Sequence, residues 1–177
     1  KILNSPILKT LPNILGDRLA KEYVLFNGTR PFGGKQRSGF NNSNEAYGVG
    51  GNEFGIRPMP GITSAEIKTL TRGSIKTATV NITAYNRTQF EIINVLYLSL
   101  GFTVLLEWGH TLYYDRNENL VENKYSLEGD FLSSKSNYNN ILDSIYKKRL
   151  DSDGNYDAIC GVVKNFNWSF ESDGTYN

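Results

Sequence analysis

The segment that decides the fold is AYNRTQFEIINVLYLSLGFTVLLEWG, residues 84–109. It joins the end of one strand to a capped helix and then to a second strand. Asn86 fits the N-cap position of that helix, and Gln89 fits the reciprocal position of a capping box. We therefore predict a helix over residues 87–99, with Gly101 at its C-terminal cap.

The predicted helix is apolar on more than one side. At about 100° per residue, one arc of about 120° gathers the side chains that we expect to pack on a sheet. These are Phe90, Ile93, Leu96, Tyr97 and Leu100. Ile92, Val95 and Leu98 lie outside that arc. Because a helix that is apolar beyond one stripe is covered on a second side, we predict that these three residues face another protein subunit.

Strands are predicted on both sides of this helix. A strand is predicted over residues 75–85, because apolar and polar side chains alternate strictly over 77–84, which is typical of a half-buried antiparallel strand. Residues 71–74 form a hairpin-length connection to a preceding strand over 62–70. The strand after the helix, 102–108, is almost continuously apolar, so we expect both of its faces to be covered.

The C-terminal third alternates hairpin, loop and helix signals. HTLYYDRNENLVENKY, residues 110–125, predicts a hairpin with its turn near 115–119. Residues 126–140 are polar and predict a loop. Residues 139–150 predict a short amphipathic helix whose apolar residues are Ile141, Leu142, Ile145 and Tyr146.

The last segment predicts a strand pair, or one long bent strand, over residues 158–170. Asp173 and Gly174 then give a hairpin turn signal between Phe170 and Tyr176. A hairpin so near residue 177 predicts either a domain that is incomplete at this end or a strand completed by another chain.

Residues 26–55 are rich in glycine and asparagine and predict a long loop. We therefore predict two parts, an N-terminal arm and loop over residues 1–55 and a single domain over 56–177. Segments of this length without regular structure are usually functional, disordered or ordered by a partner.

Composition excludes several classes of protein. The net charge of the 177-residue chain is +1, which gives no global attraction to nucleic acid or an anionic membrane. A single cysteine, Cys160, excludes an intrachain disulfide framework, and a single histidine, His110, argues against histidine-based metal sites. No apolar run approaches the roughly 20 residues that span a bilayer. We expect no cofactor and no membrane partner.

One loop carries oxygen ligands at alternating positions, a spacing that suits calcium. The residues are Asp151, Asp153, Asn155 and Asp157. However, the glycine of an EF-hand loop is replaced by Tyr156 and its bidentate glutamate by Val162. A solvated turn after the preceding helix is the simpler interpretation.

A hydrolase is one alternative function. Glu107 and His110 lie at one strand end, so a hydrolase predicts that they converge in a cleft. Glu122 and Glu128 are further carboxylates for a glycosidase, but no motif selects them.

A carbohydrate-binding β-sandwich is the other alternative, because exposed aromatic side chains stack on sugars. Trp108 and Trp168 are the candidates, although they also fit as interface anchors. The only basic run, residues 147–149, fits dipole compensation at a helix C-terminus or contact with nucleic acid in a channel.

The order of these segments resembles the β-barrel domain of baseplate hub proteins of contractile-tailed bacteriophages and related injection machines. The matching segments are SIKTATVNITAYN (74–86), RTQFEIINVLYLS (87–99), GFTVLLEWG (101–109), HTLYYDRNENL (110–120) and CGVVKNFNWSFESDGTYN (160–177), entered through FGIRPMPGIT (54–63). The resemblance covers residues 54–177.

The resemblance implies a mainly β fold with α elements, an α+β class. Its centre is a partly open antiparallel β-barrel with a strand–helix–strand insertion behind an extended N-terminal arm. Hub proteins of this family usually carry two such barrels, so that three subunits form a pseudo-sixfold ring; here one barrel is predicted. No catalytic residue is implied, and the chain is expected not to be an enzyme.

The resemblance further implies a virion protein of the tail or baseplate, assembled in the host cytoplasm. Expected partners are copies of the same chain, as a trimer or hexamer, and neighbouring tail or baseplate proteins. Nucleic acid is expected only during passage through a channel. The predicted interface residues are Ile92, Val95, Leu98, Trp108, Trp168 and Phe170.

Overall fold

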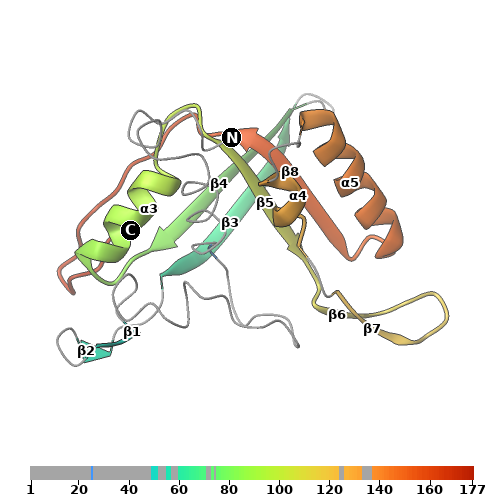
Figure 1. Cartoon of the computed structure of the whole chain (residues 1–177), viewed down its shortest axis with the longest axis horizontal. Helices are drawn as coiled ribbons and strands as arrows, with labels where there is room; N and C mark the ends of the chain where they lie inside the picture. The colour runs from blue at the N-terminus through green and yellow to red at the C-terminus, as the bar shows by residue number, and fades with distance from the viewer. Residues whose placement is uncertain are drawn as a thin grey trace. The chain divides into compact units, whose positions relative to one another are not determined.

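The computed structural model of this chain describes part of the sequence. The described residues are Leu25, 49–51, 55–56, 60–70, Gly73, 75–123, 126–132 and 137–177. They form helices and short antiparallel sheets with strands in the majority, which confirms the predicted mixed class (Figure 1). Most of the predicted arm, residues 1–55, lies outside them, so its boundary stays a prediction.

The chain divides into two compact units. The first, here called the β5–β8 unit, contains the described residues of 101–163. The second, the β3–β4 unit, contains Leu25 and the described residues of 36–100 and 164–177.

The β3–β4 unit is built on a long hairpin. Strand β3 (Gly61–Leu70) pairs antiparallel with β4 (Ile75–Thr83), from Gly61 opposite Thr83 to Leu70 opposite Ile75. The register shifts once, between Ile62 and Ser64, as at a β-bulge. Both strands were predicted within two residues of their ends.

Helix α3 (Arg87–Leu96) follows β4 and begins with the predicted cap. The Asn86 side chain accepts a hydrogen bond of 2.8 Å from the Gln89 backbone N–H. The Gln89 side chain is fully buried and accepts from the Tyr85 N–H at 2.6 Å. Gln89 thus binds the N–H of the residue before the N-cap, and this bond fixes the backbone where the chain enters the helix.

The C-terminal end of α3 was predicted too late. The C-cap is Tyr97, and the Leu98 N–H is shared between the carbonyl oxygens of Ile93 and Asn94 at 3.4 and 3.2 Å. β-branched residues near this end lower helix propensity, which fits an early termination. Gly101, the predicted cap, has φ +80 and donates instead to the Val163 oxygen at 2.9 Å.

The C-terminal segment returns to this unit and confirms the predicted hairpin. Tyr176 forms isolated bridges with Phe170 and with Ala84 at the end of β4. Gly174 takes φ +86 in the turn, a backbone conformation that glycine adopts without strain. Behind it lies a small core of Leu25, Ala84 and Ile93.

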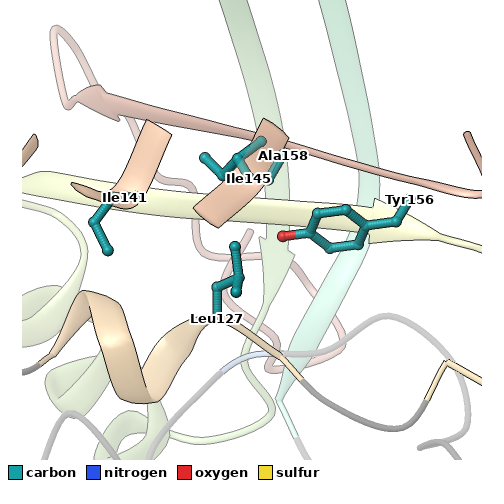
Figure 2. Close-up of a cluster of buried hydrophobic side chains, with 5 residues drawn as sticks. All are labelled: Leu127, Ile141, Ile145, Tyr156 and Ala158. Atoms are coloured by element: carbon teal, nitrogen blue, oxygen red, sulfur yellow. The ribbon is translucent and has the colours of Figure 1, made fainter. Parts of the chain in front are cut away.

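The β5–β8 unit pairs β5 (Thr103–Gly109) with β8 (Tyr156–Val162) in antiparallel register. Helix α5 (Tyr138–Asp151) packs beside β8 (Figure 1). Its core gathers apolar side chains from three segments, namely Leu127, Ile141, Ile145, Tyr156 and Ala158 (Figure 2). The predicted helix over 139–150 is confirmed, and the strand predicted over 158–170 ends at Val162.

The predicted polar loop over 126–140 was partly wrong. It contains the one-turn helix α4 (Glu128–Phe131), and α5 already begins at Tyr138. The reason is packing: Leu127 is buried and Phe131 lies against the same core, so one turn of helix brings two apolar residues to one side.

Two short hairpins complete the described elements. β6 (Leu112–Tyr114) pairs with β7 (Leu120–Glu122). Between them, the Asp115 carboxylate accepts hydrogen bonds from the N–H groups of Asn117 and Asn119, which confirms the turn predicted near 115–119. β1 (Val49–Gly51) lies in the segment predicted as a loop and pairs with β2 (Gly55–Ile56), which begins at the last residue of that segment.

The predicted barrel is not formed by these elements. Among the described residues every sheet has two strands, and none closes on itself. A two-stranded ribbon keeps a free hydrogen-bonding edge on each strand, so closure would require further strands.

Candidate functional site

Most of the exposed large apolar side chains fall into four groups, two in each unit. Single exposed apolar residues are normal, but groups of them mark interaction surfaces. The groups are Leu70 with Ile75; Phe166, Trp168 and Phe170; Leu112, Tyr114 and Leu120; and Tyr138, Leu142, Tyr146 and Leu150.

The tip of the β3–β4 hairpin carries the first group. Leu70 and Ile75 are direct cross-strand partners with relative exposures of 46% and 50%. Towards the base, Ile67 faces Ala78 across the strands, and Ala78 is exposed although it is apolar. Little of the described chain therefore covers this ribbon along its length.

An aromatic cluster beside α3 carries the second group. The Phe90 and Tyr176 rings stack with centroids 4.7 Å apart, Trp168 tilts against Phe90 at 5.0 Å, and Phe170 tilts against Tyr176 at 5.0 Å. Trp168 and Phe170 remain 53% and 62% exposed. The arrangement holds two large rings at the surface on an ordered base.

The C-terminal turn fixes the position of these rings. Ser169 and Asn177 exchange both backbone hydrogen bonds, at 2.8 and 3.1 Å. The Asp173 carboxylate accepts from the Thr175 hydroxyl at 2.7 Å and N–H at 2.9 Å, and these bonds hold the Asp173 pKa below its ordinary value. These bonds thus hold the segment that carries the rings in a defined conformation.

The six predicted interface residues fall into two sets. Trp168 and Phe170 are exposed, whereas Ile92, Val95, Leu98 and Trp108 are half-buried. Leu98 packs against the core of Leu25, Ala84 and Ile93, so its own unit covers part of it. Strand β5 was expected to be covered on both faces, and its side chains from Thr103 to Trp108 are half-buried.

The β5–β8 unit also contains a partly buried polar cluster centred on Glu107. Its carboxylate accepts from the Tyr156 hydroxyl at 2.7 Å, the Leu127 N–H at 2.9 Å and the Ser126 hydroxyl at 2.5 Å. The Lys148 ammonium lies 3.7 Å from the same carboxylate and 3.9 Å from the Tyr156 ring centroid. Glu107 thereby joins β5, β8, α5 and the segment before α4.

Burial controls the electrostatics of this cluster. Desolvation lowers the Lys148 pKa, and the Glu107 charge opposes that shift. Desolvation also raises the Tyr156 pKa, and the hydrogen bond to Glu107 raises it further. The Tyr156 hydroxyl is therefore a weaker acid than a free tyrosine, and it donates its proton to Glu107 in a bond that ties β8 to β5.

The hydrolase hypothesis receives no support from the side-chain geometry. His110 is exposed, and its backbone N–H donates to the Asn155 oxygen at 2.9 Å. Within the described part of the chain, no hydrogen bond or ion pair joins His110 to Glu107. Glu122 lies at the end of β7 and Glu128 at the start of α4.

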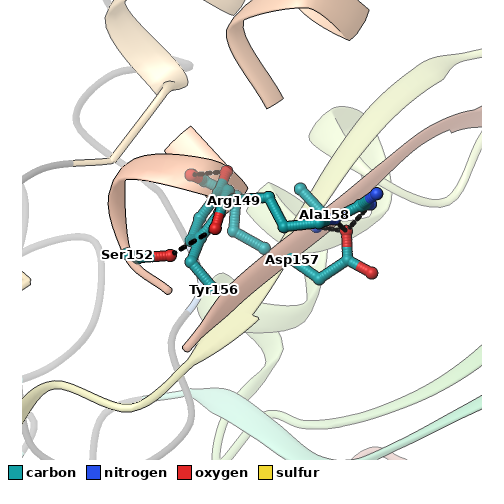
Figure 3. Close-up of polar contacts among 6 residues, drawn as sticks. Arg149, Ser152, Tyr156, Asp157 and Ala158 are labelled. Atoms are coloured by element: carbon teal, nitrogen blue, oxygen red, sulfur yellow. Dashed lines mark hydrogen bonds and ion pairs between the residues drawn. The ribbon is translucent and has the colours of Figure 1, made fainter. Parts of the chain in front are cut away.

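Two carboxylates of the calcium candidate loop, those of Asp153 and Asp157, form ion pairs with arginines. Arg149 binds the Asp157 carboxylate through two nitrogens (Figure 3). Arg116 lies 2.5 Å from Asp153. The Asn155 amide donates to the Ser152 oxygen at 3.1 Å, while Asp151 is exposed. Among the described residues, no group of three or more His, Cys, Asp or Glu side chains can hold a metal ion.

The basic run at the end of α5 does not form a basic patch. Lys147 is exposed, Lys148 is buried beside Glu107, and Arg149 is paired with Asp157. Sequence reasoning missed this distribution, although a signal existed: Ile141, Ile145 and Lys148 share one helical stripe.

Cys160 is half-buried, and desolvation raises its thiol pKa. No helix among the described residues has the length and apolarity needed to cross a membrane.

Comparison with protein-family models, with curated proteins and with solved structures found no match to this chain.

Proposed function

We propose that this chain is a structural subunit of a phage tail or baseplate, hub-like, which assembles into a ring around the tail axis. Its partners are copies of itself, as a trimer or hexamer, and neighbouring tail or baseplate proteins of the virion. The proposal rests on the resemblance of residues 54–177 to hub barrels, together with the surfaces described above.

The observation that carries the proposal is the β3–β4 ribbon. Its strands have 10 and 9 residues, and most of their side chains are exposed. An isolated two-stranded hairpin is marginally stable in water, so a ribbon of this length needs cover. Strand edges and apolar residues at its tip fit insertion into a neighbouring subunit.

In this proposal the free edges of the ribbons pair with further strands, and the partly open barrel of the hub family is completed in that way. Lys68 forms a 3.3 Å ion pair with Glu66 on the ribbon, and charges on an edge strand limit unwanted pairing before assembly. Assembly in the host cytoplasm follows from the proposed place in the virion, and nucleic acid enters only through the ring channel.

The polar groups support a structural role over an enzymatic one. Glu107 is bound by Ser126, Leu127, Tyr156 and Lys148. Arg116 pairs with Asp153, and Arg149 pairs with Asp157. Their chemistry serves the fold of the β5–β8 unit.

The test is the mass of the 19.9 kDa chain in solution, measured by light scattering across a concentration series. We expect a trimer or hexamer, and we expect the double variant Leu70→Ser/Ile75→Ser not to form it. Leu100→Ser is the matched control, since Leu100 is 65% exposed and lies outside the four groups. A wild-type chain that stays monomeric at every concentration overturns the ring assembly.

A carbohydrate-binding module is the second candidate, and one observation favours it. Trp168 is 53% exposed and is held at a fixed tilt by Phe90. An indole presented in this way can stack on a sugar ring. Titration with oligosaccharides, followed by tryptophan fluorescence, separates the two candidates: a saturating change that Trp168→Ala removes favours sugar binding.

A further inference from the structure

Helix α5 presents an apolar ridge that its own unit leaves uncovered. Ile141, Ile145 and Lys148 are buried on the side that packs on the sheet. The ridge consists of Tyr138, Leu142, Tyr146 and Leu150, with relative exposures of 57%, 40%, 60% and 58%. These residues are spaced by four, and such i±4n ridges interdigitate in the commonest class of helix packing.

A polar row runs beside the ridge. It consists of Asn139, Asp143, Lys147 and Asp151, all exposed. Asp143 and Lys147 take part in no ion pair within the described part of the chain, so both charges are available to a partner. The row therefore offers one negative and one positive charge at the middle of the helix.

We propose that the α5 ridge is a self-association surface, on which α5 of a second copy of this chain packs antiparallel. The axes would cross at about −50°, the angle at which two i±4n ridges interdigitate. The two-fold axis would pass between Leu142 and Tyr146. This contact goes beyond the ring proposed above and does not depend on it.

Charge complementarity selects a second copy as the occupant. In an antiparallel pair the polar row of one helix faces the same row of the other, so Asp143 comes opposite Lys147 of the second copy, and the reverse. In a parallel pair, the polar row of one helix would instead face the opposite side of the other helix, and the second copy's own sheet covers that side. Arg149, at the edge of the ridge, already has its charge paired with Asp157 and does not oppose the contact.

The size of the contact predicts its strength. Two helices that cross at this angle bury less than the roughly 1,200–2,000 Å² of a standard stable interface. We therefore expect a dissociation constant on the order of 0.1 mM for the isolated pair. When other contacts hold several copies together, the same surface acts at a higher effective concentration.

Charge reversal tests the pairing directly. We expect Asp143→Lys and Lys147→Asp each to weaken self-association at least about tenfold, because each places like charges opposite one another. A mixture of the two single variants should associate again, because the lysines of one variant chain then face the aspartates of the other. Sedimentation velocity across a concentration series up to about 1 mM gives the readout, with circular dichroism to confirm folding.

Two further variants complete the test. Leu142→Glu should abolish the association, and Asn140→Glu, on the same helix but off the ridge, should leave it unchanged. Association that is indifferent to charge reversal and to Leu142→Glu overturns the proposal, as does its absence at every concentration. If rings form and respond to Leu70→Ser/Ile75→Ser but not to the α5 variants, the ring proposal stands and the α5 contact is wrong. If dimers form that depend on Asp143 and Lys147 but no ring forms, the α5 contact stands and the ring proposal is wrong.

Discussion

Helices α3 and α5, the two longest among the described residues, differ in which of their apolar faces the chain itself covers. In α3 the side chains predicted to face a partner, Ile92, Val95 and Leu98, are half-buried. In α5 one side is buried in the core, and the other presents an exposed ridge from Tyr138 to Leu150. Apolar periodicity indicates that a face prefers cover, but only the tertiary structure says which chain supplies it.

The largest expected effect tests the two faces of α5 against each other. Ile145 is 4% exposed in the core, whereas Leu142 is 40% exposed on the ridge. We expect Ile145→Ala to lower the free energy of unfolding by about 3 kcal/mol, because it removes a buried side chain and leaves a cavity.

Leu142→Ala should lower it by less than about 1 kcal/mol, because much of the side chain is already in water. Urea denaturation of dilute protein gives both values. Equal losses in the two variants would mean that the ridge is covered within the monomer.

The next effect tests the polar cluster that anchors α5, which α3 lacks. Glu107→Gln keeps the size of the side chain but removes the charge beside buried Lys148. We expect a loss of about 2 kcal/mol in the free energy of unfolding, because an ammonium in a buried position loses its partner.

The matched control is Glu91→Gln on α3, which removes the exposed ion pair with Arg87 and should cost less than about 0.5 kcal/mol. Chemical denaturation at pH 7 compares the pair. A Glu107→Gln variant as stable as the control would show that the cluster contributes no net stability.

Sequence patterns predicted this fold well where the signal was local. The strand alternation of β4, the cap at Asn86, the turn at Asp115 and the C-terminal hairpin each depend on neighbouring residues, and the structure confirms each. The pairing of β5 with β8 was not predicted, because it joins residues about fifty positions apart and no local pattern encodes such a contact.

The functional surfaces were harder to predict for the same reason. The sequence pattern predicts α5 as an amphipathic helix but does not predict its exposed ridge. The pattern places Leu142 and Tyr146 on the same apolar side as Ile141 and Ile145. The Glu107 cluster depends on Lys148 and Tyr156, which reach the carboxylate only after α5 packs on the sheet.

Alkaline pH should affect the β5–β8 unit through Tyr156. Its pKa is raised in the folded chain, so above its ordinary value of 10.0 the folded state binds more protons than the unfolded state. The free energy of unfolding should therefore fall as the pH rises above about 10, by up to about 1.4 kcal/mol per pH unit.

Lys148 acts in the opposite direction, because its lowered pKa makes stability rise as the pH increases towards its ordinary value of 10.5. Tyr156→Phe should remove the alkaline loss and keep the contribution of Lys148. Denaturation midpoints between about pH 8 and 11 check this. A variant with an unchanged alkaline profile would show that other groups control it.

The smallest expected effects compare how the two helices begin. Asn86 and Asn137 each accept a 2.8 Å hydrogen bond from the backbone N–H three residues ahead. Only α3 adds a buried glutamine, Gln89, which binds the Tyr85 N–H. We expect Asn137→Ala to cost about 0.5 kcal/mol, and Asn86→Ala about 1 kcal/mol, since losing the Asn86 bond also loosens Gln89.

The double variant Asn86→Ala/Gln89→Ala then decides whether this entry acts as one unit. If the cap and the glutamine are coupled, the double variant should lose less than the sum of the two single losses, because each single change already disrupts the other bond. Additive losses would mean independent bonds. The sequence pattern of a capping box would then correctly indicate where α3 begins, but not how the chain holds that end together.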